Sequence, residues 1–261
     1  MPKVILDAGH GGSDIGEYYE RRSEKNDNLL LALRVGQFLM DRGVDVAYTR
    51  TADVYLLMLE RVSMVHQSGA DLLVSIHRLS GNTYNSTPGL DFFIKEDDEV
   101  GVQLANSIGQ SLNSSGYENY GLIVRTDIPL INDTNIPAIM IGIGYIRSRT
   151  DNTNYDDNFV PIAKGIAEGI FKILQSIETG VGASEYPFFR YRYSVGIGPY
   201  HNYNHAFDNQ LILCSIGCNT ELAKTGDGYY IYTMSYEELD EAVVIELMLR
   251  KCGFLSFIVA T

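Results

Sequence analysis

The sequence predicts an α/β domain, with an open, mostly parallel, twisted sheet flanked by helices, and a small α+β domain of ferredoxin-like βαββαβ form. Three observations lead to this fold class. Strands and helices alternate up to residue 176, which is typical of a parallel sheet. Small flexible residues at 179–184 (TGVGAS) end the alternation. Beyond them, one sequence pattern occurs twice.

The elements of the larger domain follow in order from apolar periodicity and turn residues. A β-branched run predicts the first strand at Lys3–Leu6, which leads into the glycine-rich stretch Asp7–Gly12. Ser23 is a suitable N-cap for the first helix, and Arg42-Gly43 ends that helix. The later strands are predicted at 44–49, 71–76, 89–94 and 138–143, and the later helices at 56–68, 100–112 and 162–176.

The C-terminal pattern repeats after 36 residues, and each copy has the order strand, helix, strand. The matched pairs are Tyr193/Tyr229, Val195/Ile231, Tyr200/Tyr236, Ala206/Ala242, Leu211/Leu247, Leu213/Leu249 and Gly217/Gly253. Two copies are too few for a solenoid and predict a four-stranded antiparallel sheet covered by two helices. We therefore place the domains at 1–178 and 188–261, joined by a linker at 179–187.

Composition excludes several classes of protein. The chain has 261 residues, 45% hydrophobic and 20% charged, so it is neither disordered, collagenous nor a coiled coil. Its 20 Lys and Arg against 33 Asp and Glu give a net charge of −13, which repels nucleic acid and anionic membrane surfaces. No apolar stretch is long enough to span a membrane. We expect no nucleic-acid partner and no membrane span.

The three cysteines, Cys214, Cys218 and Cys252, match neither a disulfide framework nor a zinc ribbon. Because they fall in or just after the helices of the small domain, we expect reduced, mostly buried thiols.

Three residues at the ends of strands or the start of a helix could converge on a metal ion. His10 follows the first strand, His77 follows the strand at 71–76, and Glu24 opens the first helix. Open α/β sheets bind ligands at the carboxyl ends of their strands. Two histidines and one carboxylate are a ligand set of catalytic zinc, which acidifies a bound water. The alternative is that the histidines are hydrogen-bonding residues and Glu24 a favourable charge at a helix N-terminus.

Several motifs in the correct order carry a family resemblance. They are Val4–Gly12 (VILDAGHGG), Glu24-Lys25 with Asn28-Leu29, Thr49-Arg50-Thr51 with Asp53, Leu59 and Arg61, and Val74–His77 (VSIH). Together they resemble the zinc-dependent N-acetylmuramoyl-L-alanine amidases of the type 3 amidase family, over about residues 1 to 176. The resemblance implies a single Zn²⁺ held by His10, Glu24 and His77, and cleavage of the amide between N-acetylmuramic acid and the L-alanine of the stem peptide. Asp7 would then fix a ligand imidazole or hold the glycine loop.

The chain departs from the family pattern at two places. Where the family has a catalytic glutamate in Pro-Ala-x-Leu-x-Glu-x-Gly-Phe, this chain has Gly142, and glycine cannot act as general base or acid. Where the family has His-x-Asn, this chain has His77-Arg78-Leu79, and Arg78 near the zinc would disfavour a second cation.

Gly142 admits three interpretations: a weakened or inactive amidase kept for binding, an engineered knock-out, or a replacement acid from elsewhere. Asp91 is the better candidate for a replacement, although substrate contact is its more ordinary role, and the loop acids Glu17 and Glu20 are further candidates. Zinc alone lowers the pKa of bound water, which leaves room for residual hydrolysis.

The small domain is rich in tyrosine, and its phrase Tyr191–Gly196 (YRYSVG) with Pro199-Tyr200 resembles the SPOR repeat family, whose members bind peptidoglycan. Alternation directs Tyr193, Val195, Tyr229 and Ile231 toward the helices, and Arg192, Ser194, Tyr230 and Tyr232 toward the open face of the sheet. Sugar rings could stack on these tyrosines. The alternatives are a dimer interface or a solvated sheet.

The sequence thus predicts a two-domain peptidoglycan hydrolase that acts at the cell wall. Its N-terminus, MPKVILDAGH, lacks the features of a signal peptide. We expect a protein made in the cytoplasm and released in the manner of a lysin, or a chain without its signal. A catalytically inactive peptidoglycan-binding protein is the chief alternative, and a zinc peptidase is a more distant one.

Overall fold

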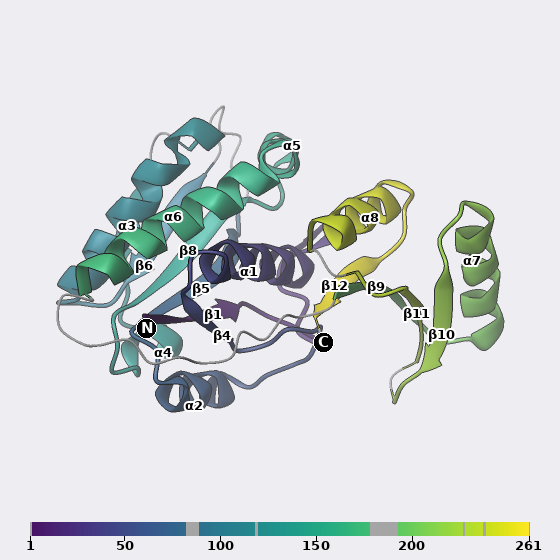
Figure 1. Ribbon diagram of the computed structural model, residues 1–261, viewed down its shortest axis with the longest axis horizontal. Helices are drawn as coiled ribbons and strands as arrows, with labels where there is room; N and C mark the ends of the chain where they lie inside the picture. The colour runs from purple at the N-terminus through teal and green to yellow at the C-terminus, as the bar shows by residue number, and fades with distance from the viewer. Residues whose placement is uncertain are drawn as a thin grey trace. The chain divides into compact units, whose positions relative to one another are not determined.

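The computed structural model describes residues 2–81, 89–117, 120–177, 193–226, 228–236 and 239–260 (Figure 1). The chain divides into two compact units. The first comprises Met1–Arg50 and Val54–Pro187, and the second comprises Phe188–Thr261 with Thr51–Asp53. The predicted linker at 179–187 lies outside the described residues, so the predicted domain boundaries stay a prediction.

A six-stranded sheet forms the centre of the first unit, in the order β4-β1-β5-β8-β6-β7. Its strands are β1 (Lys3–Ala8), β4 (Asp45–Tyr48), β5 (Leu72–Leu79), β6 (Leu90–Ile94), β7 (Gly121–Val124) and β8 (Ala138–Tyr145). All neighbours are parallel except β6 and β8, which run antiparallel. The predicted open, mostly parallel sheet is therefore confirmed. A two-stranded hairpin, β2 (Tyr18–Tyr19) and β3 (Arg22–Ser23), lies outside it.

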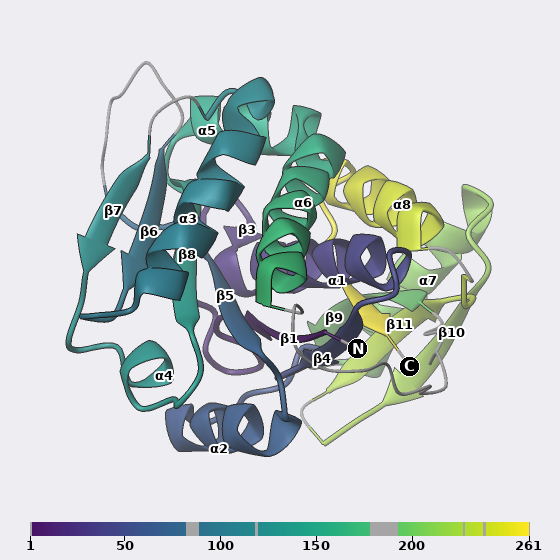
Figure 2. The same ribbon diagram turned by 60° about the vertical axis from the view of Figure 1, so that its left-hand side comes forward.

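Helices cover both faces of this sheet, as Figures 1 and 2 show. One face carries α1 (Glu24–Met40), α3 (Glu99–Leu112) and α6 (Phe159–Ile177); the other carries the shorter α2 (Met58–Ser68) and α4 (Pro129–Asn132). A short 3₁₀ turn (Asn113–Ser115) follows α3, and α5 (Arg149–Asp157) precedes α6. The core under α2 and α4 is built from Ile5, Val62, Val65, Ala70, Leu73, Leu130, Ile131 and Ala138.

The helix α1 begins where the sequence predicts, but Ser23 does not cap it. Ser23 stands at the N-cap position without a side-chain hydrogen bond to the helix, and its buried Oγ has no partner. Its backbone belongs to the β2–β3 hairpin, where Ser23 pairs with Tyr18. The acids Glu24 and Asp27 occupy that turn instead.

The second unit has the predicted βαββαβ form. In chain order it contains β9 (Tyr193–Tyr200), α7 (Tyr203–Ser215), β10 (Thr220–Lys224), β11 (Tyr229–Thr233), α8 (Leu239–Lys251) and β12 (Ser256–Ala260). The sheet order is β10-β11-β9-β12, with every pair antiparallel, which is the ferredoxin-like arrangement. The duplicated residues Ala206 and Ala242, and Leu213 and Leu249, are fully buried at matching places.

The expectation of buried cysteines is wrong. Cys214 and Cys252 are exposed, and Cys218 is intermediate. The buried residues of α7 are Ala206 and Leu213, so Cys214, one position further, falls outside that stripe. Cys252 follows the last residue of α8. Among the residues described, no helix is both long and apolar enough to cross a membrane.

Candidate metal centre

The structure brings the three predicted metal ligands together at the carboxyl end of the central strands. His10 Nε2 lies 3.2 Å from Glu24 Oε2, and His77 Nδ1 lies 2.9 Å from Glu24 Oε1. One ligand atom from each residue lies within 4.8 Å of the others. The two imidazole rings meet edge to face, with centroids 5.0 Å apart. We call these residues the His10–Glu24–His77 cluster.

Glu24 is the central acceptor of the cluster. Its Oε1 accepts from the backbone N–H of Arg78 at 3.2 Å, and its Oε2 accepts from the backbone N–H of Glu17 at 3.0 Å. Burial alone would raise the pKa of Glu24, but the contacts with His10 and His77 outweigh it and hold the pKa well below its usual range. The carboxylate is therefore charged and fixed in place.

A further carboxylate orients His10, and the sequence analysis did not identify it. Asp14 Oδ2 lies 2.8 Å from His10 Nδ1, which leaves Nε2 of the same ring directed at Glu24. Burial lowers the pKa of His10, whereas Glu24 and Asp14 raise it, and the net effect is a raised pKa. A carboxylate on the second nitrogen of a ligand histidine is a recurrent feature of zinc sites.

Glycines allow the close packing of this cluster. A Cβ atom on Gly9 would lie 2.1 Å from His77 Cε1, so the ring of His77 lies directly against the Gly9 backbone. Gly16 has φ +63°, and a Cβ atom there would lie 2.7 Å from both Glu24 Oε2 and His10 Cδ2. Side chains at either position would displace ligand residues.

Asp7 holds the glycine loop through Arg61, which is one of the two roles expected for it. Its carboxylate accepts from Thr49 Oγ1 at 2.7 Å, Ser75 Oγ at 2.6 Å and Arg61 Nη1 at 2.6 Å. Arg61 also donates to the loop carbonyl of His10 at 2.6 Å. Burial alone would raise the pKa of Asp7. The guanidinium of Arg61 and the hydroxyl donors outweigh this effect, so the pKa of Asp7 lies below its usual value.

The donor set fits zinc. Two imidazole nitrogens and a carboxylate converge on one point, one imidazole is oriented by a second carboxylate, and the backbone N–H groups around Glu24 fix its position. The contacts of the two histidines with Glu24 also fit the alternative, in which the histidines are hydrogen-bonding residues, so both interpretations stay open.

A row of paired residues crosses the sheet beside the cluster. His77 pairs with Gly142, Gly142 with Asp91, and Asp91 with Gly121. Directly opposed residues project to the same face of a sheet. His77, position 142 and Asp91 therefore share the face that α2 and α4 cover, and position 142 lies nearer than Asp91 to the His10–Glu24–His77 cluster.

Of the candidate replacement acids, Asp91 belongs to this row. Burial raises the pKa of Asp91 despite a hydrogen bond from the backbone N–H of Gly121. Its Oδ1 would lie 2.2 Å from a Cβ atom on Gly121, so the carboxylate leans toward β7 and away from His77. Glu17 and Glu20 form ion pairs with Arg147 at 2.7 Å and Arg149 at 2.5 Å.

Arg78 does not direct its charge at the cluster, contrary to the expectation from sequence. Its guanidinium is buried and donates to Asp27 Oδ2, Ile143 O and Asn152 Oδ1, and it stacks 4.2 Å from the centroid of Tyr155. The charge is paired with Asp27, which also forms an ion pair with Arg22.

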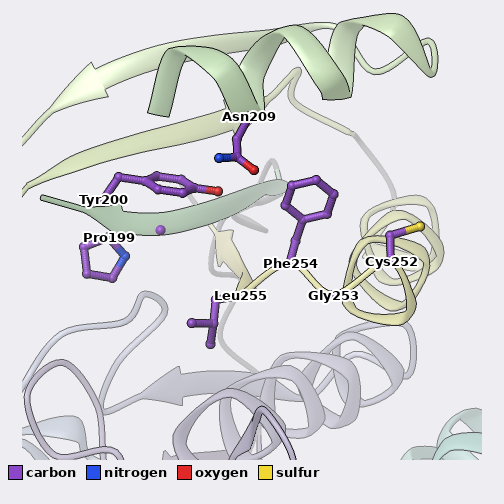
Figure 3. A pocket seen from close by; sticks show the side chains of 8 residues that line it. Pro199, Tyr200, Asn209, Cys252, Gly253, Phe254 and Leu255 are labelled. Carbon is purple, nitrogen blue, oxygen red and sulfur yellow. The ribbon is translucent and has the colours of Figure 1, made fainter. Parts of the chain in front are cut away.

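The second unit has two surfaces of interest. On the face of its sheet away from the helices, the rings of Tyr230 and Tyr232 stack with centroids 6.1 Å apart, as the alternation predicts. Tyr193, Val195 and Ile231 are buried on the other face; Arg192 lies outside the described residues. Figure 3 shows a separate pocket of about 330 Å³, lined by Gly198, Pro199, Tyr200, Asn209, Cys252, Gly253, Phe254 and Leu255.

Comparison with known proteins identifies the family. A profile of the N-acetylmuramoyl-L-alanine amidases matches residues 4–172. The endolysin of Bacillus phage SPP1 is 31% identical over 188 residues, covering 67% of each chain. The probable cell wall amidase LytH of Staphylococcus epidermidis is 28% identical over 183 residues, covering 66% of this chain and 58% of LytH.

Solved structures agree with the sequence comparison. The catalytic domain of the amidase CwlV from Bacillus (Paenibacillus) polymyxa var. colistinus has a TM-score of 0.61 at 28% identity, covering 67% of this chain and 99% of that one. The CwlD amidase of Clostridioides difficile, solved in complex with the GerS lipoprotein, has a TM-score of 0.62 at 27% identity, covering 67% of this chain and all of CwlD. The predicted resemblance is confirmed: this chain belongs to the N-acetylmuramoyl-L-alanine amidase family and is a peptidoglycan amidase by class.

Proposed function

We propose that this chain is a zinc-dependent amidase that cleaves the bond between N-acetylmuramic acid and the L-alanine of the stem peptide, and that it does so slowly. The observation that carries the proposal is the convergence of His10, Glu24 and His77 within 4.8 Å at the strand ends of an amidase fold. The low rate follows from Gly142, which supplies no carboxylate beside His77.

His10, Glu24 and His77 would hold the zinc ion. When bound, zinc would polarise the amide carbonyl and acidify a water molecule. The chain's own residues keep the ligands ready: Asp14 fixes the ring of His10, and the N–H groups of Glu17 and Arg78 fix Glu24. A general base typically contributes about 10²- to 10⁴-fold, and this factor is what a glycine at position 142 removes.

The direct test is hydrolysis of a muramyl peptide by zinc-loaded protein, with His77→Ala as the control. We expect slow release of a peptide with a new N-terminal alanine and an intact lactyl sugar, and no release by His77→Ala. Cleavage between amino acids instead would support a zinc peptidase. Zinc binding without any cleavage would support the alternative function, a non-catalytic peptidoglycan-binding protein, which the absence of a carboxylate at position 142 favours.

Asp91 is the proposed source of any residual acid–base catalysis. It lies in the same row as His77, two strands away, and burial raises its pKa. Asp91→Asn should then lower kcat without changing zinc affinity. If Asp91 contacts substrate instead, the same variant should raise KM and leave kcat unchanged.

We further propose that the second unit is a SPOR-like module that binds peptidoglycan and that the protein acts at the cell wall, as the names of its relatives, an endolysin and a probable cell wall amidase, suggest for them. The stacked rings of Tyr230 and Tyr232 support a sugar-binding face. A binding module raises the local concentration of the enzyme on its polymeric substrate.

Sedimentation with purified sacculi tests the module. Tyr230→Ala/Tyr232→Ala should remain in the supernatant, while the helix-surface control Phe207→Ala, which is 40% exposed on α7, should sediment as the unaltered protein does. Asn209→Leu probes the pocket of Figure 3 in the same assay. Loss of binding only in Asn209→Leu would move the sugar site from the sheet to the pocket.

A further inference from the structure

The side chain of Leu79 fills the space that a side chain at position 142 would need. A Cβ atom on Gly142 would lie 2.3 Å from Leu79 Cδ2, 3.0 Å from Leu79 Cγ and 3.4 Å from Phe93 Cε2. Carbon atoms in favourable contact are about 3.5–4.0 Å apart. Leu79 is only 6% exposed, so it is packed in this position.

Relief of this overlap requires Leu79 to move. Its Cδ2 would have to leave its present place, and its Cγ would have to shift by a few tenths of an ångström. The backbone on both sides is also held. Ile146 N–H donates to Leu79 O at 3.1 Å, and Arg78 donates to Ile143 O at 2.6 Å and Gly144 O at 3.1 Å. The ends of β5 and β8 therefore cannot separate easily to admit a larger residue.

We propose that Leu79 and Gly142 are an interlocked pair that closes the β8 side of the His10–Glu24–His77 cluster to an acidic side chain. This inference rests on the proposed function and deepens it, because it makes Leu79 a positioning residue that limits turnover jointly with Gly142. A carboxylate introduced at position 142 alone stays displaced from the cluster. It becomes effective only when Leu79 is shortened.

The proposal joins the two departures from the family pattern into one structural change. Position 79 lies two residues after the ligand His77 on the same strand, and position 142 pairs with His77 across the sheet. Their side chains therefore share one face and compete for one volume. A larger side chain at position 142 beside an unchanged Leu79 would overfill that volume. A shortened Leu79 beside an unchanged Gly142 would leave it partly empty.

Thermal unfolding tests the interlock without reference to activity. Gly142→Ala and Gly142→Glu are each made in the unaltered chain and in Leu79→Ala. In the unaltered chain, each should lower Tm by about 3–10 °C, the size expected for overpacking in a domain of this length. In the Leu79→Ala background, the uncharged Gly142→Ala should cause a much smaller drop. Equal drops in the two backgrounds would overturn the proposal.

Hydrolysis of the muramyl peptide by zinc-loaded protein tests the functional half. Leu79→Ala/Gly142→Glu should exceed both the unaltered protein and Gly142→Glu by about 10²- to 10⁴-fold. A matched control, Leu90→Ala/Gly142→Glu, removes an equally buried leucine from the opposite face of β6 and should give no gain. If Gly142→Glu alone turns over as fast as the pair, the proposal is wrong.

Zinc affinity, measured for every variant, separates this inference from the proposed function. All variants should bind zinc as the unaltered protein does, because neither Leu79 nor Gly142 supplies a ligand atom. If every variant binds zinc and none cleaves, the amidase proposal fails. The unfolding comparison still decides whether Leu79 and Gly142 are interlocked.

Discussion

At the scale of single residues, the candidate metal centre depends on groups outside the proposed ligand set. Asp14 orients His10, and the unsubstituted backbone of Gly9 makes room for the ring of His77. Both residues act by position: Asp14 selects which nitrogen of His10 faces Glu24, and Gly9 allows the His77 ring to approach the first strand. Changing either should alter zinc affinity before it alters the fold.

Asp14→Asn should weaken zinc binding by about 10- to 100-fold, the usual effect of losing a carboxylate behind a ligand histidine. Half of the Asp14 side chain is exposed, so the fold should remain intact. Competition with a chromogenic chelator measures the affinity, and circular dichroism checks the fold. Asp208→Asn, on the exposed surface of α7, is the control and should bind zinc normally. Unchanged affinity in Asp14→Asn would remove Asp14 from the metal centre.

Gly9→Ala should abolish tight zinc binding. The added methyl would lie 2.1–2.7 Å from three atoms of the His77 ring, so the ring would have to leave its place. Gly226→Ala is the matched control, because a Cβ atom there meets nothing within 4 Å. The same chelator competition reports the result. Normal affinity in Gly9→Ala would show that the ligand position of His77 differs from the one described here.

At the scale of elements, the ends of β5 and β8 are joined by a bulge that Arg78 stabilises. Leu79 pairs with Tyr145 and His77 with Gly142, so β8 has one extra residue between these pairs. The buried guanidinium of Arg78 donates to the carbonyl groups of Ile143 and Gly144 at this irregularity. The bulge therefore depends on a charged side chain from the neighbouring strand.

Arg78→Met should lower the free energy of unfolding by about 3 kcal/mol, because it removes the guanidinium donor from two carbonyl groups and one of two arginines from Asp27. Urea unfolding at pH 7 measures the loss. Arg149→Met, which removes an exposed pair with Glu20, should show no measurable change. A loss equal to that of the control would mean that the bulge holds its shape without Arg78.

The sequence correctly predicted helices with long apolar periodicity, such as α1 and α6, and also the short strand β4. It missed the short elements β2, β3, β7 and α4. The antiparallel course of β6 was also missed, because strand direction depends on connections through the whole sheet. The sequence also did not predict α5, because this helix is short and has few apolar residues. Its buried residues are Asp151 and Tyr155.

Family motifs and the positions of the strand ends predicted one part of the candidate site, the three residues of the cluster. His10, Glu24 and His77 follow from both, and the structure brings them together. The role of Asp14 could not be predicted, because it depends on the positive φ of His10 and the turn that follows. The contact between Leu79 and Gly142 was equally hidden, since the register of β5 against β8 decides it.

At the scale of the whole molecule, the net charge of the chain determines its long-range electrostatic interaction with the cell wall. The chain has a net charge of −13, and the stem peptides of peptidoglycan carry negatively charged carboxylates. Like charges repel at low ionic strength, and salt screens this repulsion over about 10 Å at 0.1 M. The recognition of peptidoglycan that we propose for the second unit would therefore come from short-range contacts such as ring stacking and hydrogen bonds, which salt affects little.

Binding to sacculi should accordingly strengthen as salt rises from 10 to about 150 mM, opposite to the behaviour of a cationic wall-binding protein. Salt weakens the repulsion between the −13 chain and the wall carboxylates but leaves aromatic stacking in place. Sedimentation with purified sacculi at several salt concentrations measures the effect, with Tyr230→Ala/Tyr232→Ala as the variant that should bind poorly at each of them. If binding of the unaltered protein instead falls steadily with salt, a local basic surface dominates recognition, and the stacked tyrosines are not the main contact.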